Sequence, residues 1–261
     1  MTSADPAPLF GRHPVLELLR ADSRRVEEIA IAAQGRGPAL QELLALAKSR
    51  DVRVSFRTRD QLTAMAGTPN HQGVVARVAE ASYADLADLL AVPASLGEPA
   101  FLLALDQIQD PRNLGAILRA AEVTGVHGVI VMKHRSVGLT PAAAKSAMGA
   151  VEWVKVARVA NLAQSLDMLK KEGVWIIGSV VKGGTSPWET DLSGPLCLVL
   201  GSEGEGLRPL VARSCDLLLT LPMKGRLGSV SVSAAAAVLC YEVVRQRGRF
   251  GRGEPGSRER P

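Results

Sequence analysis

Asn113 and Arg119 are the first pair of side chains in this sequence whose types and spacing suit a ligand site. They lie in LDQIQDPRNLGAILRAAE, in which Asp110 and Pro111 suit the start of a helix. Six residues of helix rise about 9 Å, so we expect the amide and the guanidinium to flank one cleft. The alternative, and the commoner arrangement in proteins, is that Asn113 caps the helix and Arg119 forms an exposed salt bridge.

A second segment, LCLVLGSEGEGL, is an apolar run that continues into a glycine-rich loop from Gly201 to Gly206, with Glu203 inside it. Glycines at this spacing allow positive φ angles and a close approach of the backbone to a ligand. The order of the glycines differs from the dinucleotide-binding fingerprint, and the G-K-[ST] ending of a P-loop is missing. Taken alone, the loop is as compatible with a tight turn as with a site.

The third segment, LPMKGRLGSVSVSAAAA, is an apolar run, a glycine-rich loop and a serine-rich helix start. Ser229, Ser231 and Ser233 are typical N-cap residues, so one interpretation is a helix cap with redundant hydroxyls. The other is a set of backbone N–H groups and hydroxyls that faces a ligand.

The elements that position these segments form an α/β pattern in the second half of the chain. Helices are predicted at 114–125, 161–173 and 229–247, and they alternate with apolar strands at 101–108, 128–132, 153–159, 174–181, 196–201 and 217–223. Continuous apolar strands between helices indicate a parallel sheet that is covered on both faces. Ligands of such sheets bind at the carboxyl ends of the strands, where the three segments begin.

The first part of the chain, residues 1–79, predicts a smaller α/β domain. Helices are expected at 14–19 and 38–49, and strands at 29–33, 52–56 and 74–78. Its loops and helix ends are rich in arginine, which indicates either a solvated surface or contact with phosphates. Residues 80–99 hold a short helix and then a Pro/Gly/Ser-rich stretch, so we interpret them as a linker between this domain and a second one at 100–248. The basic segment 249–261 has the composition of a disordered tail.

Charge is distributed unevenly along the 261 residues. The net charge of +5 divides into +3 for residues 1–79 (11 positive, 8 negative), −2 for 80–244 (14 and 16) and +4 for 245–261 (6 and 2). Aromatic residues are only 3% of the chain, which argues against a module that reads single strands by stacking bases.

Three widely separated cysteines indicate reduced core residues without a metal cluster. We expect a cytoplasmic protein with neither a membrane nor a metal partner, since no signal or long apolar segment occurs.

Together and in this order, the three segments resemble the motifs of the SpoU (TrmH) family of RNA ribose 2′-O-methyltransferases in the SPOUT superfamily. The match consists of N-x-G-x-I-x-R-x-A, L-G-x-E-G-x-G, and P-M-x-G followed by a serine-rich helix start. Near the N-terminus, GRHPVLELL and NHQGVVARV resemble the small L30e-like RNA-binding domain that precedes the catalytic domain in many ribosomal-RNA members.

This resemblance implies a C-terminal α/β domain with a deep trefoil knot, although most chains are unknotted. It implies that S-adenosylmethionine binds in the knot through backbone atoms at Gly201, Leu221 and Val230. It also implies a homodimer in which catalytic residues converge from two chains.

The catalytic residues that the resemblance implies are Asn113, Arg119, Glu203, Ser229 and Ser231. The family assigns the motif-one arginine, here Arg119, to activation of the ribose 2′-hydroxyl. Because a guanidinium is almost never deprotonated, we interpret Arg119 as a clamp on the adjacent phosphate and hydroxyl. Asn113 and Glu203 would fix the geometry of the loops and of Arg119, and Ser229 would orient the substrate. Ser231 stands where the family usually has asparagine, so its role is the most open.

The resemblance also predicts an RNA-binding face on the first domain, formed by Arg12, Arg53, Arg57, Arg59 and His71. The expected substrate is ribosomal RNA, with methylation of a guanosine in the large-subunit (23S) RNA. One alternative is a transfer-RNA substrate. The other is a non-catalytic RNA-binding or ribosome-assembly factor with the same fold, which is motivated by Ser231.

Overall fold

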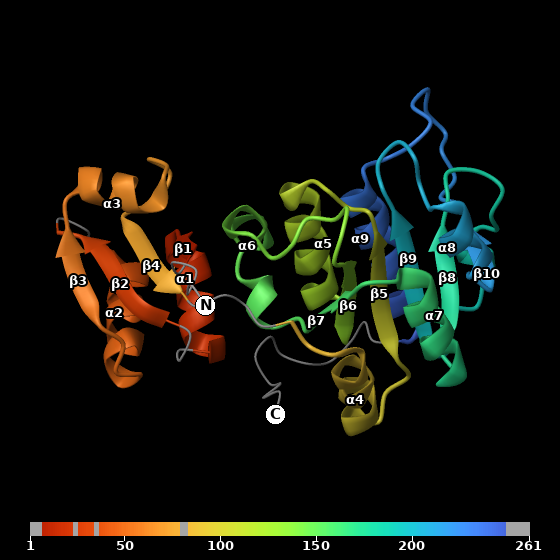
Figure 1. Cartoon of the computed structure of the whole chain (residues 1–261), viewed down its shortest axis with the longest axis horizontal. Helices are drawn as coiled ribbons and strands as arrows, with labels where there is room; N and C mark the ends of the chain where they lie inside the picture. The colour runs from red at the N-terminus through yellow and green to blue at the C-terminus, as the bar shows by residue number, and fades with distance from the viewer. Residues whose placement is uncertain (1–6, 23–25, 34–36, 79–82, 249–261) are drawn as a thin grey trace.

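The computed structural model describes residues 7–22, 26–33, 37–78 and 83–248, which form two sheets with their helices (Figure 1). The predicted tail at 249–261 and three arginines of the basic first part, Arg24, Arg25 and Arg36, lie outside these residues. The smaller sheet lies at one end of the long axis of the molecule and the larger sheet at the other.

The smaller sheet has the strand order β1-β4-β2-β3, in which only the β2–β3 pair is parallel. Helices α1 and α2 cover one face around a core that includes Val15, Ile29 and Leu43, and α3 covers the other face. The strands are β1 (Ala7–Phe10), β2 (Val26–Ala32), β3 (Val54–Arg57) and β4 (Val74–Val78), and the helices are α1 (Arg12–Asp22), α2 (Pro38–Ser49) and α3 (Arg59–Ala66).

Two elements of this part were absent from the sequence prediction, β1 and α3. Strand β1 is only four residues long and includes Pro8, so its pattern is too short to recognise. Helix α3 begins with a capping box, in which Thr58 accepts from the N–H of Gln61 and the Gln61 side chain accepts from the N–H of Thr58. That Thr-x-x-Gln spacing is the signal that could have predicted the helix.

The larger sheet has six strands in the order β10-β8-β9-β5-β6-β7, and every neighbouring pair is parallel. This confirms the predicted α/β fold with a parallel sheet. Its strands are β5 (Phe101–Asp106), β6 (Gly128–Met132), β7 (Val156–Val159), β8 (Trp175–Ser179), β9 (Leu196–Gly201) and β10 (Leu217–Leu219). Strands β5, β6 and β9 are buried along their whole length, as a sheet covered on both faces requires.

Helices cover both faces of this sheet. One face packs against α5 (Pro111–Val123), α6 (Pro141–Ala147) and α9 (Val232–Gln246), and the other against α4 (Leu86–Leu96), α7 (Leu162–Lys171) and α8 (Pro209–Arg213). Helix α4 lies in the segment that we expected to act as a linker. Its Leu89 is fully buried, and a Cβ on Gly128 would lie 2.3 Å from the Leu89 Cγ.

The last helix starts three residues later than predicted. Ser231 is its N-cap and accepts a hydrogen bond from the N–H of Ala234, whereas Ser229 and Val230 belong to the preceding loop. The predicted strands 153–159, 174–181 and 217–223 are also shorter in the structure, because apolar residues at their ends lie in loops.

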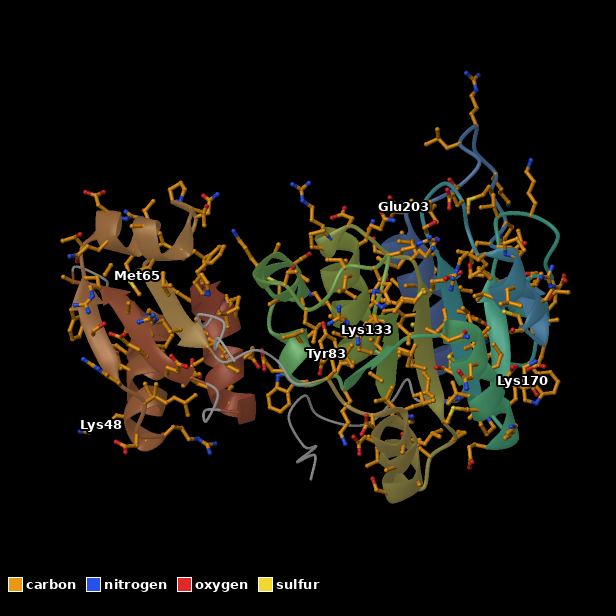
Figure 2. The ribbon with its side chains drawn as sticks, viewed as in Figure 1. Lys48, Met65, Tyr83, Lys133, Lys170 and Glu203 are labelled. Carbon is orange, nitrogen blue, oxygen red and sulfur yellow. The ribbon has the colours of Figure 1, made fainter. Side chains whose placement is uncertain are left out.

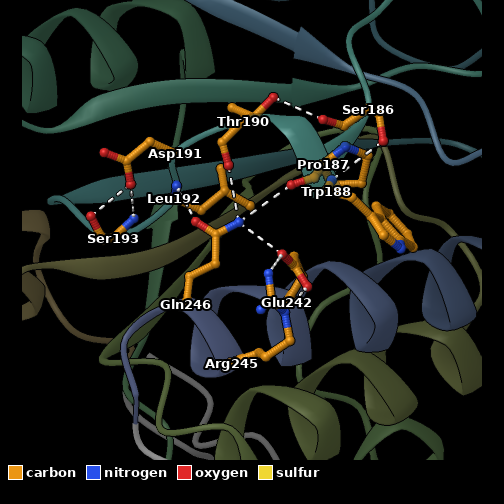
Figure 3. Close-up of polar contacts among 10 residues, drawn as sticks. All are labelled: Ser186, Pro187, Trp188, Thr190, Asp191, Leu192, Ser193, Glu242, Arg245 and Gln246. Atoms are coloured by element: carbon orange, nitrogen blue, oxygen red, sulfur yellow. Dashed lines mark hydrogen bonds and ion pairs between the residues drawn. The ribbon is translucent and has the colours of Figure 1, made fainter.

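The C-terminal end of α9 is hydrogen-bonded to the segment between β8 and β9 (Figure 3). The Gln246 amide donates to the carbonyl of Thr190 at 3.0 Å and to that of Pro187 at 3.3 Å, and its oxygen accepts from the N–H of Leu192 at 2.7 Å. Glu242 receives hydrogen bonds from Gln246 and Arg245, and the bond from Arg245 is the main cause of the lowered pKa of Glu242. These bonds hold α9 in register with the sheet.

The two parts touch through α1, β1, α6 and the 3-10 helix η2 (Ala150–Glu152). The indole N–H of Trp153 donates to Glu17 at 3.2 Å, and the ammonium of Lys145 lies 4.6 Å from the centre of the Phe10 ring. Gly149 allows this contact, since a Cβ there would lie 2.5 Å from the Glu17 Cβ.

All three cysteines are unpaired, and burial raises the pKa of Cys240 to about 12 and that of Cys215 to about 11, as expected for inert core thiols. In the described ranges, no group of three or more His, Cys, Asp or Glu side chains could hold a metal ion. No helix among the same residues is long and apolar enough to cross a bilayer.

Candidate active site

A cavity of about 970 Å³ opens at the carboxyl ends of β8 and β9. Three loops line it: residues 179–182 after β8, 201–207 after β9, and 221–232 between β10 and α9. Gly201, Leu221 and Val230, the three positions that the sequence assigned to a cofactor, all line this cavity. The volume lies at the upper end of the range for pockets that enclose a small-molecule cofactor.

The glycines of the 201–206 loop are required by its geometry. A Cβ on Gly201 would lie 2.1 Å from the carbonyl carbon of Gly206 and 2.4 Å from the nitrogen of Leu207. Ser202 and Gly206 exchange two backbone hydrogen bonds of 3.1 and 3.0 Å, and Gly204 and Gly206 have φ angles of 100° and 69°. The loop is therefore a narrow turn that exposes backbone groups to the cavity.

A buried ion pair anchors this loop to the central strand, and the sequence analysis missed it. The Asp106 carboxylate at the end of β5 is fully buried and accepts from the backbone N–H and the Nε of Arg208 at 2.9 and 2.7 Å. An Arg208 terminal nitrogen also lies 3.3 Å from the Met132 sulfur. An aspartate that directly follows a continuous apolar strand is the signal that could have identified it, because a buried carboxylate needs a partner.

The three predicted segments meet at the start of α9. Glu203 accepts from the N–H of Val232 at 3.2 Å, and Ser233 donates to the Asn113 side-chain oxygen at 2.9 Å. Glu203 and Asn113 also line a second cavity of about 330 Å³; Glu203 is labelled in Figure 2. Asn113 and Glu203 thus hold the first turn of the helix from two sides.

The two serines chosen from the third segment have different surroundings. Ser229 is exposed on the wall of the large cavity, where its hydroxyl can reach a ligand. Ser231 caps α9, and its hydroxyl lies 3.2 Å from that of Ser233. A serine fulfils this capping role as well as an asparagine does.

The position of Arg119 differs from the sequence prediction. Arg119 lines a separate cavity of about 280 Å³ with His13, Glu17 and Trp153, so Asn113 and Arg119 do not flank one cleft, and Glu203 does not hold Arg119. The physical reason is rotation: six residues turn a helix by about 600°, which places the two side chains on different faces. Within the described ranges, the exposed Arg119 guanidinium makes no hydrogen bond or ion pair.

The arginines assigned to RNA lie at several places on the smaller part. Arg53 and Arg59 are exposed, at the start of β3 and of α3. Arg12 donates to the carbonyl of Gln72 at 3.2 Å, and Arg57 lies 3.7 Å from Glu28. Arg12 and Arg57 are partly exposed, so part of each guanidinium stays accessible.

The position of His71 also differs from the sequence prediction, which placed it on the RNA-binding face. His71 is 1% exposed, its Nδ1 accepts from the N–H of Gly73 at 3.0 Å, and its Nε2 lies 3.3 Å from the Thr63 hydroxyl. Burial is the main cause of its lowered pKa, and the charge of Arg59 adds to it. A ring enclosed in this way shapes the loop before β4 and does not face a nucleic acid.

Comparison with known proteins identifies the family to which this arrangement of motifs belongs. The family model described as the SpoU rRNA Methylase family matches residues 100–241, which is more than half of the chain. The chain belongs to this family. A further model, described as RNA 2′-O ribose methyltransferase substrate binding, matches residues 8–84.

Individual relatives of this SpoU chain span nearly its whole length. It is 42% identical to the 23S rRNA (guanosine-2′-O-)-methyltransferase RlmB of Ralstonia nicotianae, over 92% of the chain and 95% of that protein. It is 39% identical to RlmB of Escherichia coli, over 92% of the chain and 98% of that protein. Among solved structures, the SpoU methyltransferase AviRb of Streptomyces viridochromogenes in complex with AdoMet has the same fold, with a TM-score of 0.77, 23% identity and coverage of 93% and 90%.

Proposed function

We propose that this SpoU protein transfers a methyl group from S-adenosylmethionine to the ribose 2′-hydroxyl of a guanosine in 23S ribosomal RNA. The observation that carries the proposal is the convergence of the three motif segments on one cavity at the carboxyl edge of a parallel sheet. Relatives that are about 40% identical over more than nine-tenths of the chain are named as enzymes of this activity.

The cavity fits the cofactor. Leu221, Met223 and Val230 provide apolar surface, and the turn that follows Gly201 provides backbone donors and acceptors. An adenosine with a short amino-acid arm needs this combination, and AviRb binds AdoMet on the same fold. When bound, S-adenosylmethionine supplies the electrophilic methyl group.

The residues of the chain then have the task of positioning the ribose. Asn113 and Glu203 fix the start of α9, which holds Ser229 at the cavity wall for a hydrogen bond to the substrate. The guanidinium of Arg119 binds the phosphate beside the target ribose and stabilises the negative charge that develops on the 2′-oxygen. Methyl transfer needs the 2′-oxygen, the methyl carbon and the sulfonium sulfur of the cofactor in line. The C–S bond breaks as the O–C bond forms, and the hydroxyl proton leaves to solvent. Positioning of this kind lowers the barrier.

We propose that the enzyme is a homodimer and that the second copy supplies Arg119 to the site. Within one chain, Arg119 faces a different cavity from Asn113 and Glu203. Val123 on α5 and Val238 and Tyr241 on α9 are 56%, 44% and 47% exposed on two helices that pack together. An exposed apolar face beside Arg119 suits a two-fold contact that brings this arginine to the partner's cofactor cavity.

The same proposal includes the finer description of the fold. We propose an L30e-like RNA-binding domain at residues 1–79, a connecting segment at 80–99 whose helix α4 packs on the larger sheet, and a trefoil-knotted domain at 100–248. The chain path supports the knot, since it runs from β10 at the edge of the sheet back to α9 beside α5 and passes the Glu203 loop. Arg12, Arg53, Arg57 and Arg59 would bind RNA phosphates, and the protein would act in the cytoplasm.

Two experiments separate this function from its alternatives. Isothermal titration measures S-adenosylmethionine binding, and transfer of a labelled methyl group is followed with 23S rRNA and with transfer RNA as substrates. We expect cofactor binding and transfer to ribosomal RNA alone. Cofactor binding without transfer, unchanged in Ser231→Asn, would identify a non-catalytic factor, and label in transfer RNA alone would identify the other substrate.

A further inference from the structure

A short cationic loop follows β6, and neither the cofactor cavity nor the predicted RNA-binding face includes it. Lys133, His134 and Arg135 are consecutive and exposed. Across the part of the chain that the structure describes, their side chains form no hydrogen bond or ion pair. The net charge of −2 for residues 80–244 concealed this cluster, because a sum over a long segment does not show where the charges lie.

The backbone of this loop is held in one shape. The Lys133 N–H donates to the carbonyl of Val159 at 2.7 Å, and the Lys133 carbonyl accepts from the Arg158 guanidinium at 3.1 Å. On the far side of the loop, the hydroxyl of Ser136 and the N–H of Val137 both donate to the carbonyl of Ile108, at 3.1 and 2.8 Å. The exposed cations therefore project from a fixed base, which reduces the entropy lost when they bind a ligand.

Tyr83 supports the same base. Its hydroxyl accepts from the N–H of Leu139 at 2.9 Å, and its ring lies 5.1 Å from the guanidinium carbon of Arg158. Tyr83 and Lys133 are labelled in Figure 2. The guanidinium of Arg158 thus contacts the loop itself. Lys133 and Arg135 are the cationic side chains of the loop that can bind a ligand.

This loop borders the active site. Ile108, whose carbonyl holds Ser136 and Val137, lines the cavity that also contains Asn113 and Glu203. Met132, the residue before the loop, contacts the Arg208 guanidinium that is paired with Asp106. All of these groups lie at the carboxyl edge of one parallel sheet, where the substrate ribose must approach.

We propose that Lys133 and Arg135 bind backbone phosphates of the substrate RNA close to the methylated nucleotide, as a second RNA-binding surface on the methyltransferase part. This inference rests on the proposed function for the identity of the ligand. Two unpaired cations on a rigid base beside the site suit a polyanion whose phosphates flank the reacting ribose. The loop would hold the target strand in register while the first part binds RNA further away.

The test compares two charge-matched double variants of the full-length protein. Lys133→Gln with Arg135→Gln removes the two cations of the loop. Lys155→Gln with Lys171→Gln removes two exposed lysines at the opposite, amino edge of the same sheet. The affinity for an in vitro transcript of 23S rRNA is measured by filter binding at several KCl concentrations, and S-adenosylmethionine affinity is measured by titration calorimetry.

We expect the loop variant to bind the transcript about tenfold more weakly at low salt, and its slope of log K against log[KCl] to fall by roughly 1.4 to 2. The control should retain the wild-type slope, and both variants should retain wild-type cofactor affinity. Equal binding by the loop variant, the control and the wild type would overturn the proposal. These isotherms require no methyl transfer, so an inactive wild-type protein would disprove the proposed function and leave this test intact.

Discussion

The two sheets of this protein differ in how their chemistry could be recognised from the sequence. In the parallel sheet, the residues selected at strand ends meet at one edge, around the cavities that contain Gly201, Glu203 and Asn113. In the smaller sheet, residues selected by charge are scattered, and His71 is buried. Parallel topology forces all carboxyl ends to one edge, whereas a mixed sheet has no such rule. Spacing is thus informative in the first case, and charge alone is a weak guide in the second.

The largest expected effect comes from Gly201→Ala, which tests whether the cavity of the parallel sheet is the cofactor site. The new methyl group collides with the Gly206 carbonyl and the Leu207 nitrogen, so the turn must open. We expect S-adenosylmethionine affinity to fall at least about a hundredfold, the equivalent of a 2 to 3 kcal/mol distortion. Titration calorimetry measures this loss. Gly194→Ala is the control, since a Cβ there meets nothing within 4 Å.

Arg119→Lys tests whether Arg119 takes part in methyl transfer. A point charge replaces a bidentate fork, so we expect the methylation rate to fall roughly a hundredfold while cofactor affinity stays unchanged. Near wild-type turnover would remove Arg119 from the mechanism.

Mixing Arg119→Lys with Gly201→Ala sharpens that test. If Arg119 acts across the dimer, a mixed dimer has one complete site, and statistical mixing should restore about a quarter of the wild-type rate. If Arg119 acts within its own chain, no complete site forms, and the mixture stays as inactive as its components.

Arg53→Gln with Arg59→Gln tests the first part as an RNA-binding surface. Both side chains are exposed, so we expect RNA affinity to fall about tenfold and cofactor affinity to remain constant. Filter binding with the 23S transcript measures the loss, and Lys155→Gln with Lys171→Gln again serves as the control. Unchanged affinity would move RNA recognition away from these two arginines.

The smallest effect concerns His71 and the pH dependence of stability. Because the pKa of His71 is lower in the folded protein than in the unfolded chain, the unfolded state binds the proton more readily. The contribution of neutral His71 to the free energy of unfolding is therefore fully present above pH about 6.5. It decreases as the pH falls below that value, by less than about 1.4 kcal/mol per pH unit. Urea denaturation at pH 7.5 and 5.5 should show a smaller difference for His71→Gln than for the wild type. An unchanged difference, with the exposed His13→Gln as reference, would contradict the assignment.

The sequence predicted the parallel sheet and three residues that line the large cavity because apolar runs and glycine-rich turns are local signals. It did not predict the direction in which Arg119 points, since Asn113 and Arg119 were compared by axial rise without rotation. The Asp106–Arg208 pair also escaped, because it joins residues about a hundred positions apart. Packing of this kind depends on the whole fold, as does the burial of His71.

The most direct test of the central claim follows a labelled methyl group from S-adenosylmethionine into an in vitro transcript of 23S rRNA, which is then digested to nucleosides. The account predicts label in 2′-O-methylguanosine with the wild-type protein and with Gly194→Ala, and far less label with Gly201→Ala at the same cofactor concentration. Label on a base, or no transfer by a wild-type protein that binds the cofactor, would contradict it.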